Sequence, residues 1–318
     1  MKQTLRIPGN LLLLGEYAVL EPGGLGVVMA VKPYVVASWA SAPHFCLTGV
    51  TPHASDRWHP GAAEKTFIAR AAAALFGCLK NRAGVELAAL RVALELNSCD
   101  FFDGRGNKRG FGSSAAVVVA LVTSVAHALS DADPAALQRV DLLQTAVEVH
   151  RAAQDGRGSG YDIAASLHGG AGLFCGGALP RFTPLNHSRW PQLFLRSGPA
   201  AVSTREAIVR YEELKRRDPA LVSRFVDASN RAVEAFARAP DWQSQRTALA
   251  RAREQAAALG DAIGVPADPQ HPDTPHSLAK CLGAGNELIG QFVDPSAGPP
   301  LVPEAPAARV QPCAVQHQ

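Results

Sequence analysis

The sequence predicts an α+β protein of two domains. Strand-like runs dominate near the N-terminus, where 11-LLLLGEYAVL-20 and 26-GVVMAVKPYVVASWA-40 flank the turn-forming segment 21-EPGG-24. Beyond the Pro and Gly cluster at 176–184 the pattern changes to one strand followed by helices. A chain of 318 residues is long enough to bury two hydrophobic cores.

Local patterns place the elements along the chain. A helix with Asp133 as its cap and Pro134 in its first turn is expected at 134–154. The other expected elements are helices at 62–79, 203–217, 219–239 and 241–260, a helix directly after 110–112, and strands near 85–96, 163–174 and 193–198. We expect a boundary near residue 180, so that domains span 1–180 and 181–293 and the Pro-rich 294–318 forms a flexible tail.

Composition limits the possible functions. With 47% hydrophobic and 19% charged residues, the chain fits a soluble globular protein. A net charge of +3 without a dense basic block gives no reason to expect nucleic-acid binding. The apolar run 115–129 is shorter than a membrane span and predicts a core helix, with no membrane partner. The six cysteines lack metal-site or disulfide spacing, which favours a reducing cytoplasm.

The segment 110-GFGSSA-115 joins two glycines and two serines to an uncharged apolar run. Taken alone, it fits an ordinary turn before a buried element as well as it fits a functional loop. In the functional interpretation, Ser113 or Ser114 begins a helix whose first N–H groups have no intrahelical partner, and such a helix start attracts phosphate. Gly110 and Gly112 would let a ligand approach the main chain, and Lys108 would add positive charge.

Four segments in order, 8-PGN-10, 15-GEYAVLEPG-23, 110-GFGSSA-115 and 159-SGYD-162, resemble the motifs of the GHMP kinases. The resemblance covers roughly the first two thirds of the chain. It implies an N-terminal domain similar to the second domain of ribosomal protein S5 and a ferredoxin-like C-terminal domain. Within the family, the segment 15–23, Lys108 and the segment 201–214 are most similar to the phosphomevalonate kinases.

The resemblance implies phosphoryl transfer from ATP, with Mg²⁺, to a small phosphorylated acceptor, by a monomer or homodimer. Asp162 would act as the base, because transfer of a γ-phosphoryl group to a weak nucleophile needs a proton acceptor. Lys108 would assist catalysis. A lone loop aspartate more often caps a turn. The nucleotide residues would be Glu16, Gly110, Gly112, Ser113, Ser114 and Ala115, with Ser114 also on the metal, and the substrate residues would be Asn10, Ser159, Gly160, Ser203 and Thr204.

Two features depart from the family pattern. Asn10 stands where Pro-Gly-Lys has its lysine, and 283-GAGNELIG-290 interrupts a glycine-rich motif with Asn286 and Glu287. The helix and strand that should follow are replaced by the Pro-rich tail. The alternatives are therefore mevalonate kinase, homoserine or diphosphomevalonate chemistry, a non-catalytic nucleotide or metabolite binder, and a pure interaction protein.

Overall fold

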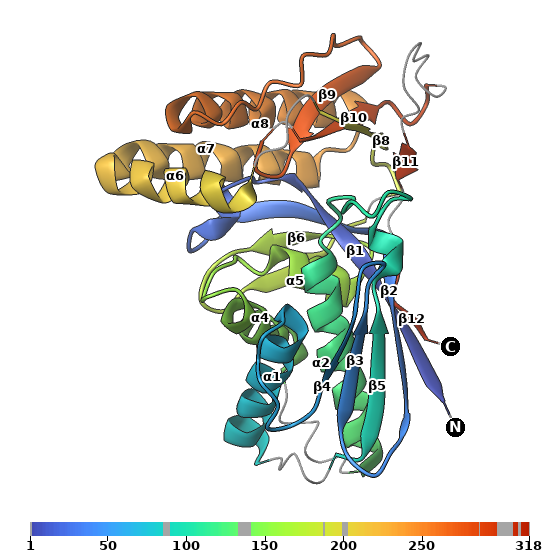
Figure 1. Cartoon of the computed structure of the whole chain (residues 1–318). Helices are drawn as coiled ribbons and strands as arrows, with labels where there is room; N and C mark the ends of the chain where they lie inside the picture. Colours follow the sequence, from blue (N-terminus) through green and yellow to red (C-terminus); the bar gives the residue numbers. More distant parts are fainter. Residues whose placement is uncertain are drawn as a thin grey trace. The chain divides into compact units, whose positions relative to one another are not determined.

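The computed structural model describes residues 2–84, 90–132, 141–186, 188–198, 203–285, 287–297, 308–310 and 313–317. They form two compact units (Figure 1). Unit 1 comprises Met1–Asn10, Ala30–Gly169 and Cys313–Gln318, and unit 2 comprises Leu11–Met29 and Gly170–Pro312. Strands β1 (Gln3–Leu14) and β2 (Leu25–Ser41) contribute residues to both units, because each strand runs across a boundary between them.

The sheet of unit 1 has the strand order β12-β1-β2-β5-β3-β4. Its other strands are β3 (Cys46–Val50), β4 (Ser55–Trp58), β5 (Val92–Asn97) and the two-residue β12 (Gln316–His317). Strand β5 pairs with β2 in the antiparallel direction and with β3 in the parallel direction, where Leu47 faces Leu94 across the ladder. Both leucines are buried, so this register directs apolar side chains into the core.

Four helices supply the rest of the unit 1 core: α1 (Phe67–Ala83), α2 (Ser113–Ala132), α4 (Leu142–Ala153) and α5 (Tyr161–His168). Helix α2 packs against α1, α4, α5 and β5. Its residues 113–130 are long and apolar enough to cross a membrane, but 72% of that window is buried in the fold. The expectation of a core helix at this position is confirmed.

Unit 2 contains β6 (Ala171–Cys175), which pairs with β2 and β7 (Arg181–Pro184). A second sheet has the order β11-β8-β10-β9, made of β8 (Gln192–Ser197), β9 (Ser277–Leu282), β10 (Leu288–Val293) and β11 (Ala308–Val310). The short 3-10 helix η1 (Ala18–Leu20) also belongs to this unit.

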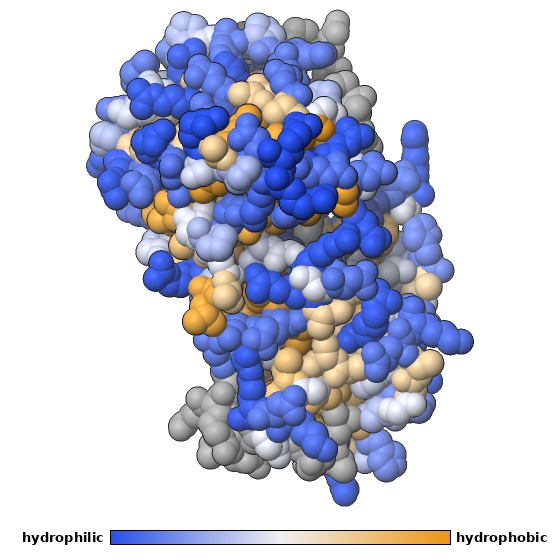
Figure 2. All heavy atoms as spheres, turned by 90° about the vertical axis from the view of Figure 1, so that its left-hand side faces the viewer, coloured by the Kyte–Doolittle hydropathy of each residue, from blue (hydrophilic) through white to orange (hydrophobic). Residues whose placement is uncertain are grey.

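Helices α6 (Thr204–Arg217), α7 (Pro219–Arg238) and α8 (Trp242–Ile263) confirm the three helices expected after residue 200. Each begins after a side-chain cap, provided by Ser203, Asp218 and Asp241 respectively. On the face shown in Figure 2 the surface is mostly hydrophilic, and the large exposed hydrophobic residues among those described are Leu179 and Val209.

The structure differs from the sequence expectations in three places. Segments of the expected flexible tail form β11 and β12, because each adds its backbone hydrogen bonds to a sheet edge. Segment 163–174 begins inside helix α5 before it becomes β6. Helix α4 is described from Leu142 with Asp141 as its cap; the expected cap Asp133 and the segment 85–89 lie outside the described residues. The domain limits at 180 and 293 stay a prediction.

Candidate functional site

The start of helix α2 follows two glycines with positive φ and leaves three backbone N–H groups without an intrahelical partner. Gly110 and Gly112 have φ angles of 78° and 68°, a conformation that favours glycine. The N–H of Ala116 donates to Gly112 O at 3.1 Å, so the N–H groups of Ser113, Ser114 and Ala115 precede the first bond of the helix. Both serines are half-buried, whereas the Ala115 side chain is buried and contributes to the core.

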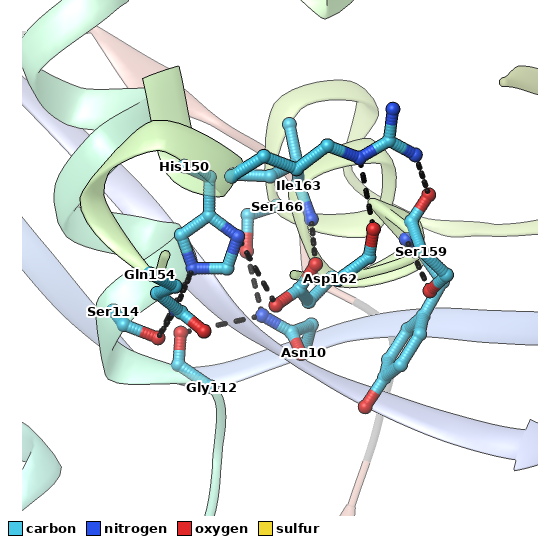
Figure 3. Close-up of polar contacts among 12 residues, drawn as sticks. Asn10, Gly112, Ser114, His150, Gln154, Ser159, Asp162, Ile163 and Ser166 are labelled. Carbon is cyan, nitrogen blue, oxygen red and sulfur yellow. Dashed lines mark hydrogen bonds and ion pairs between the residues drawn. The ribbon is translucent and has the colours of Figure 1, made fainter. Parts of the chain in front are cut away.

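Asn10 donates hydrogen bonds to the loop that precedes α2. Its backbone N–H donates to Phe111 O at 3.0 Å, and its side-chain Nδ2 donates to Ser166 Oγ at 3.0 Å and to Gly112 O at 3.4 Å (Figure 3). The side chain is buried, and a Cβ added at Gly112 would lie 2.3 Å from Asn10 Nδ2. Asn10 therefore connects the loop to α5 through neutral hydrogen bonds, where the family pattern places a charge.

Asp162 lies in the first turn of α5, where the helix dipole stabilises a carboxylate. Its Oδ1 accepts a hydrogen bond from the N–H of Ile163 at 2.9 Å, and its Oδ2 lies 3.8 Å from His150 Nδ1. The side chain is 21% exposed, so one edge of the carboxylate remains open to solvent or a ligand.

His150 of α4 and Gln154, the residue that ends this helix, lie between Asp162 and the start of α2. The His150 side chain is buried, and its Nε2 lies 3.3 Å from Ser114 Oγ. Gln154 Nε2 contacts the same ring nitrogen and lies 3.5 Å from Ser114 Oγ (Figure 3). Neither residue was predicted from the sequence. The available signal was the four-residue spacing in 150-HRAAQ-154, which puts the two side chains on one helix face.

Hydrogen bonds of two side chains hold the turn before α5. Arg151 donates from Nε to Gly158 O at 2.9 Å and from Nη2 to Ser159 O at 3.2 Å. Ser159 is buried, and its Oγ accepts from the N–H of Tyr161 at 3.4 Å. Gly160 has a φ of 91° and no space for a Cβ beside a valine of α4. Substrate binding by Ser159 and Gly160 stays a prediction.

Lys108 is exposed at the base of the loop before Gly110, where it forms a β-bridge with Phe102. Asp103 organises that loop: its Oδ1 accepts from the N–H groups of Arg105 and Asn107, each at 2.8 Å. These hydrogen bonds, that from Asn107 first, hold the pKa of Asp103 below its usual value. Lys108 therefore lies two positions before Gly110, directly after a turn that the Asp103 carboxylate stabilises.

Three predicted site residues belong to unit 2. The Glu16 carboxylate is buried against the Lys280 ammonium, and burial raises the pKa of Glu16 although Lys280 opposes the rise. Ser203 Oγ accepts from the N–H of Glu206 at 3.4 Å and caps α6, while Thr204 is exposed in the first turn. The roles proposed for these three residues in ligand binding stay predictions.

The altered motif 283-GAGNELIG-290 connects β9 to β10. Leu282 pairs with Leu288, so β9 and β10 form a hairpin, and Gly283 follows β9 with a φ of 75°, a conformation that favours glycine. Glu287 is exposed, and Asn286 lies outside the described residues. The positive φ accounts for the glycine at position 283. A ligand role for this motif stays a prediction.

The residues of unit 1 fit a metal carried by a nucleotide better than a metal held by the protein alone. Among the described residues, no group of three or more His, Cys, Asp and Glu side chains is arranged to hold a metal ion. The Ser114 hydroxyl and the Asp162 carboxylate are nevertheless oxygen donors of the kind that Mg²⁺ prefers, and Mg²⁺ commonly adds phosphate oxygens and water to one or two protein ligands.

Comparison with known proteins gives the same assignment as the motifs. Residues 67–170 match the family model of the GHMP kinases N terminal domain. Phosphomevalonate kinase of Streptomyces sp. (strain CL190) is 32% identical over 183 residues, which are 51% of this chain and 46% of that protein. The chain therefore matches about half the length of that relative.

Solved structures share the fold at low sequence identity. The Lin0012 protein of Listeria innocua has a TM-score of 0.79 at 20% identity, and the match covers 100% of this chain and 99% of that protein. Phosphomevalonate kinase of Streptococcus pneumoniae, solved with phosphomevalonate and AMPPNP, has a TM-score of 0.69 at 16% identity, with 92% of each chain covered. The two-domain α+β fold expected from the motifs is confirmed, and residues 67–170 are similar to the N-terminal domain of the GHMP kinases.

Proposed function

We propose that the chain is an ATP-dependent phosphotransferase that transfers the γ-phosphoryl group to phosphomevalonate in the mevalonate pathway. The observation that carries the proposal is the polar network in which Asp162, His150 and Ser114 connect the start of α5 to the start of α2. That network puts a carboxylate beside a helix start suited to phosphate, which are two parts that phosphoryl transfer requires. The curated relative named phosphomevalonate kinase supports the choice of acceptor.

In this proposal, different residues of unit 1 bind the nucleotide, the metal ion and the acceptor. The N–H groups of Ser113, Ser114 and Ala115 would bind nucleotide phosphate, and Lys108 would neutralise part of its charge. Ser114 Oγ would hold Mg²⁺ bound to the nucleotide, and the ion would offset negative charge on the transferred group. Asp162 would accept the proton of a hydroxyl acceptor. For phosphomevalonate, whose phosphate oxygens are largely deprotonated at neutral pH, Asp162 would instead orient the acceptor.

The test is an ADP-release assay with Mg-ATP and, in separate reactions, mevalonate, phosphomevalonate and diphosphomevalonate. We expect turnover with phosphomevalonate and little with the other two acceptors. Preference for mevalonate would replace the proposed acceptor and leave the kinase assignment standing. ATP binding without turnover on any acceptor would instead contradict the kinase assignment and favour a nucleotide-binding relative.

The binder alternative has one observation in its favour, since the buried Asn10 supplies hydrogen bonds and no charge where the family pattern has a lysine. A mevalonate kinase is the second catalytic alternative. We place the protein in the cytoplasm, because its six cysteines, all of which lie among the described residues, form no disulfide.

A further inference from the structure

We propose that His150 is a positioning residue that fixes the Asp162 carboxylate with one ring nitrogen and the Ser114 hydroxyl with the other. The inference rests on the proposed function, because it assigns those two side chains to the acceptor and to the nucleotide. It adds that one imidazole of α4 sets the positions of both the Asp162 carboxylate and the Ser114 hydroxyl. His150 itself touches neither ligand.

Burial and contacts with three helices hold the His150 ring in place. The side chain is 4% exposed, so its polar atoms must find partners inside the unit. The Phe67 ring packs edge-on against it, with centroids 6.2 Å apart and planes at 84°. The imidazole is therefore held between α1, α2 and α5, and its two nitrogens point to different elements (Figure 3).

Gln154 sets the roles of the two nitrogens. Its amide Nε2 faces His150 Nε2 and also donates toward Ser114 Oγ, and we therefore assign the acceptor role to the ring nitrogen on that side. The ring proton then lies on Nδ1, which faces Asp162 Oδ2 at 3.8 Å. This separation is within ion-pair range and beyond hydrogen-bond distance, and we expect it to shorten when a ligand is bound, as catalytic contacts often do.

Two substitutions separate the two functions of the ring. The amide of asparagine occupies the place of Nδ1 and ends short of Nε2, so His150→Asn keeps a donor for Asp162 and loses the contact with Ser114. The amide of glutamine reaches the place of Nε2, so His150→Gln keeps the Ser114 contact and loses the one to Asp162. A residue with a packing role alone would give no such division.

The experiment measures kcat, the KM for ATP and the Kd for AMPPNP in both variants. We expect His150→Asn to raise the KM and Kd for nucleotide about tenfold at nearly unchanged kcat, as loss of one hydrogen bond to a ligand-positioning group would do. His150→Gln should lower kcat about tenfold and leave the nucleotide Kd within about twofold. His127→Gln is the matched control, because this α2 histidine lies about 20 Å along the helix from Ser114 and stacks on Trp39.

Equal losses in both variants, or wild-type values in both, would overturn the inference. If His150→Asn does not fold, as judged by its thermal unfolding, Gln154→Met removes the amide on the Ser114 side and should reproduce the weakened nucleotide binding; unchanged binding overturns the inference as well. If the wild type binds AMPPNP but transfers no phosphoryl group, the proposed function fails, and the division in Kd between the Asn and Gln variants still decides the role of His150.

Discussion

The ammonium of Lys280 contacts the carboxylate of Glu16 inside unit 2 and closes a separation of 264 residues along the chain. The Lys280 side chain is 0% exposed and that of Glu16 is 6% exposed. Lys280 also donates to Cys281 O at 2.9 Å. Two buried charges thus neutralise each other and connect the residues before η1 to strand β9, and each would be left without its counter-charge if the other were removed.

We predict that Lys280→Met lowers the free energy of unfolding by about 3–5 kcal/mol, since it leaves the Glu16 carboxylate buried without its partner. Urea unfolding measures the effect. The double variant Glu16→Gln/Lys280→Met is the control and should recover much of the loss, because replacing both charges removes the uncompensated one. A single variant within 1 kcal/mol of the wild type, a margin of about fivefold in the unfolding equilibrium, would contradict the prediction.

The same variant should show a characteristic pH dependence. Burial raises the pKa of Glu16 above its ordinary value of 4.5, so the folded state holds the proton to higher pH than the unfolded state, and this group's contribution to stability falls as the pH rises through that window. Removing Lys280 raises the folded pKa further and extends the window. The stability deficit of Lys280→Met should therefore be largest at neutral pH and shrink toward pH 4.5 in urea titrations. A constant deficit would exclude Glu16 as its source.

Gly112→Ala tests the packing beneath the phosphate loop. A Cβ there would lie 2.3 Å from Asn10 Nδ2, whose side chain is buried and hydrogen-bonded, and the φ of 68° adds strain of about 1–2 kcal/mol. Gly110→Ala is the matched control, since its φ is 78° but nothing lies within 4 Å of the added Cβ. We expect Gly112→Ala to be the less stable variant in thermal unfolding and to bind AMPPNP more weakly. Equal stability of the two would show that Asn10 gives way without cost.

Asp162→Asn should remove most activity and leave AMPPNP binding nearly unchanged, because we propose that the carboxylate acts on the acceptor and not on the nucleotide. With a hydroxyl acceptor, the loss of a general base typically costs about 10²–10⁴-fold in rate. With phosphomevalonate, a larger share of the effect should fall on the KM for the acceptor, since its phosphate needs orientation more than deprotonation. Steady-state kinetics with each acceptor separates the two outcomes. A variant with wild-type kcat and acceptor KM would exclude Asp162 from the site.

Local signals predicted much of the fold. The helical pattern at 203–217, 219–239 and 241–260 predicted three consecutive helices close to their observed bounds. The two-residue strand β12 was missed, because its pairing with β1 depends on a neighbour more than 300 positions earlier and its own sequence has no strand pattern. The same reason hides the membership of 11–29 in unit 2, which contacts through space decide.

The candidate site was predicted unevenly for a similar reason. Ser114 and Asp162 stand in segments whose residue types suggest their chemistry, whereas His150 lies on an otherwise ordinary amphipathic helix. The partner of Glu16 was also hidden, because a lysine in a buried strand gives no sign of the carboxylate it will meet. The sequence showed Asn10 only as the loss of a positive charge, and the structure adds that its amide donates hydrogen bonds to Gly112 and Ser166.

Ser114→Ala and Ser113→Ala form a matched pair at the start of α2. Both keep the backbone N–H groups that would bind phosphate, and both remove one hydroxyl, so a general effect on helix capping should be shared. Ser114 alone has the contacts with His150 and Gln154. We therefore expect Ser114→Ala to raise the KM for Mg-ATP about tenfold and to require a higher Mg²⁺ concentration for half-maximal rate, while Ser113→Ala changes either value by less than about twofold. Titration of ATP at fixed excess Mg²⁺, and of Mg²⁺ at fixed ATP, measures both effects. If the two variants behave alike, the hydroxyl of Ser114 has no special role and only the backbone of the loop serves the nucleotide.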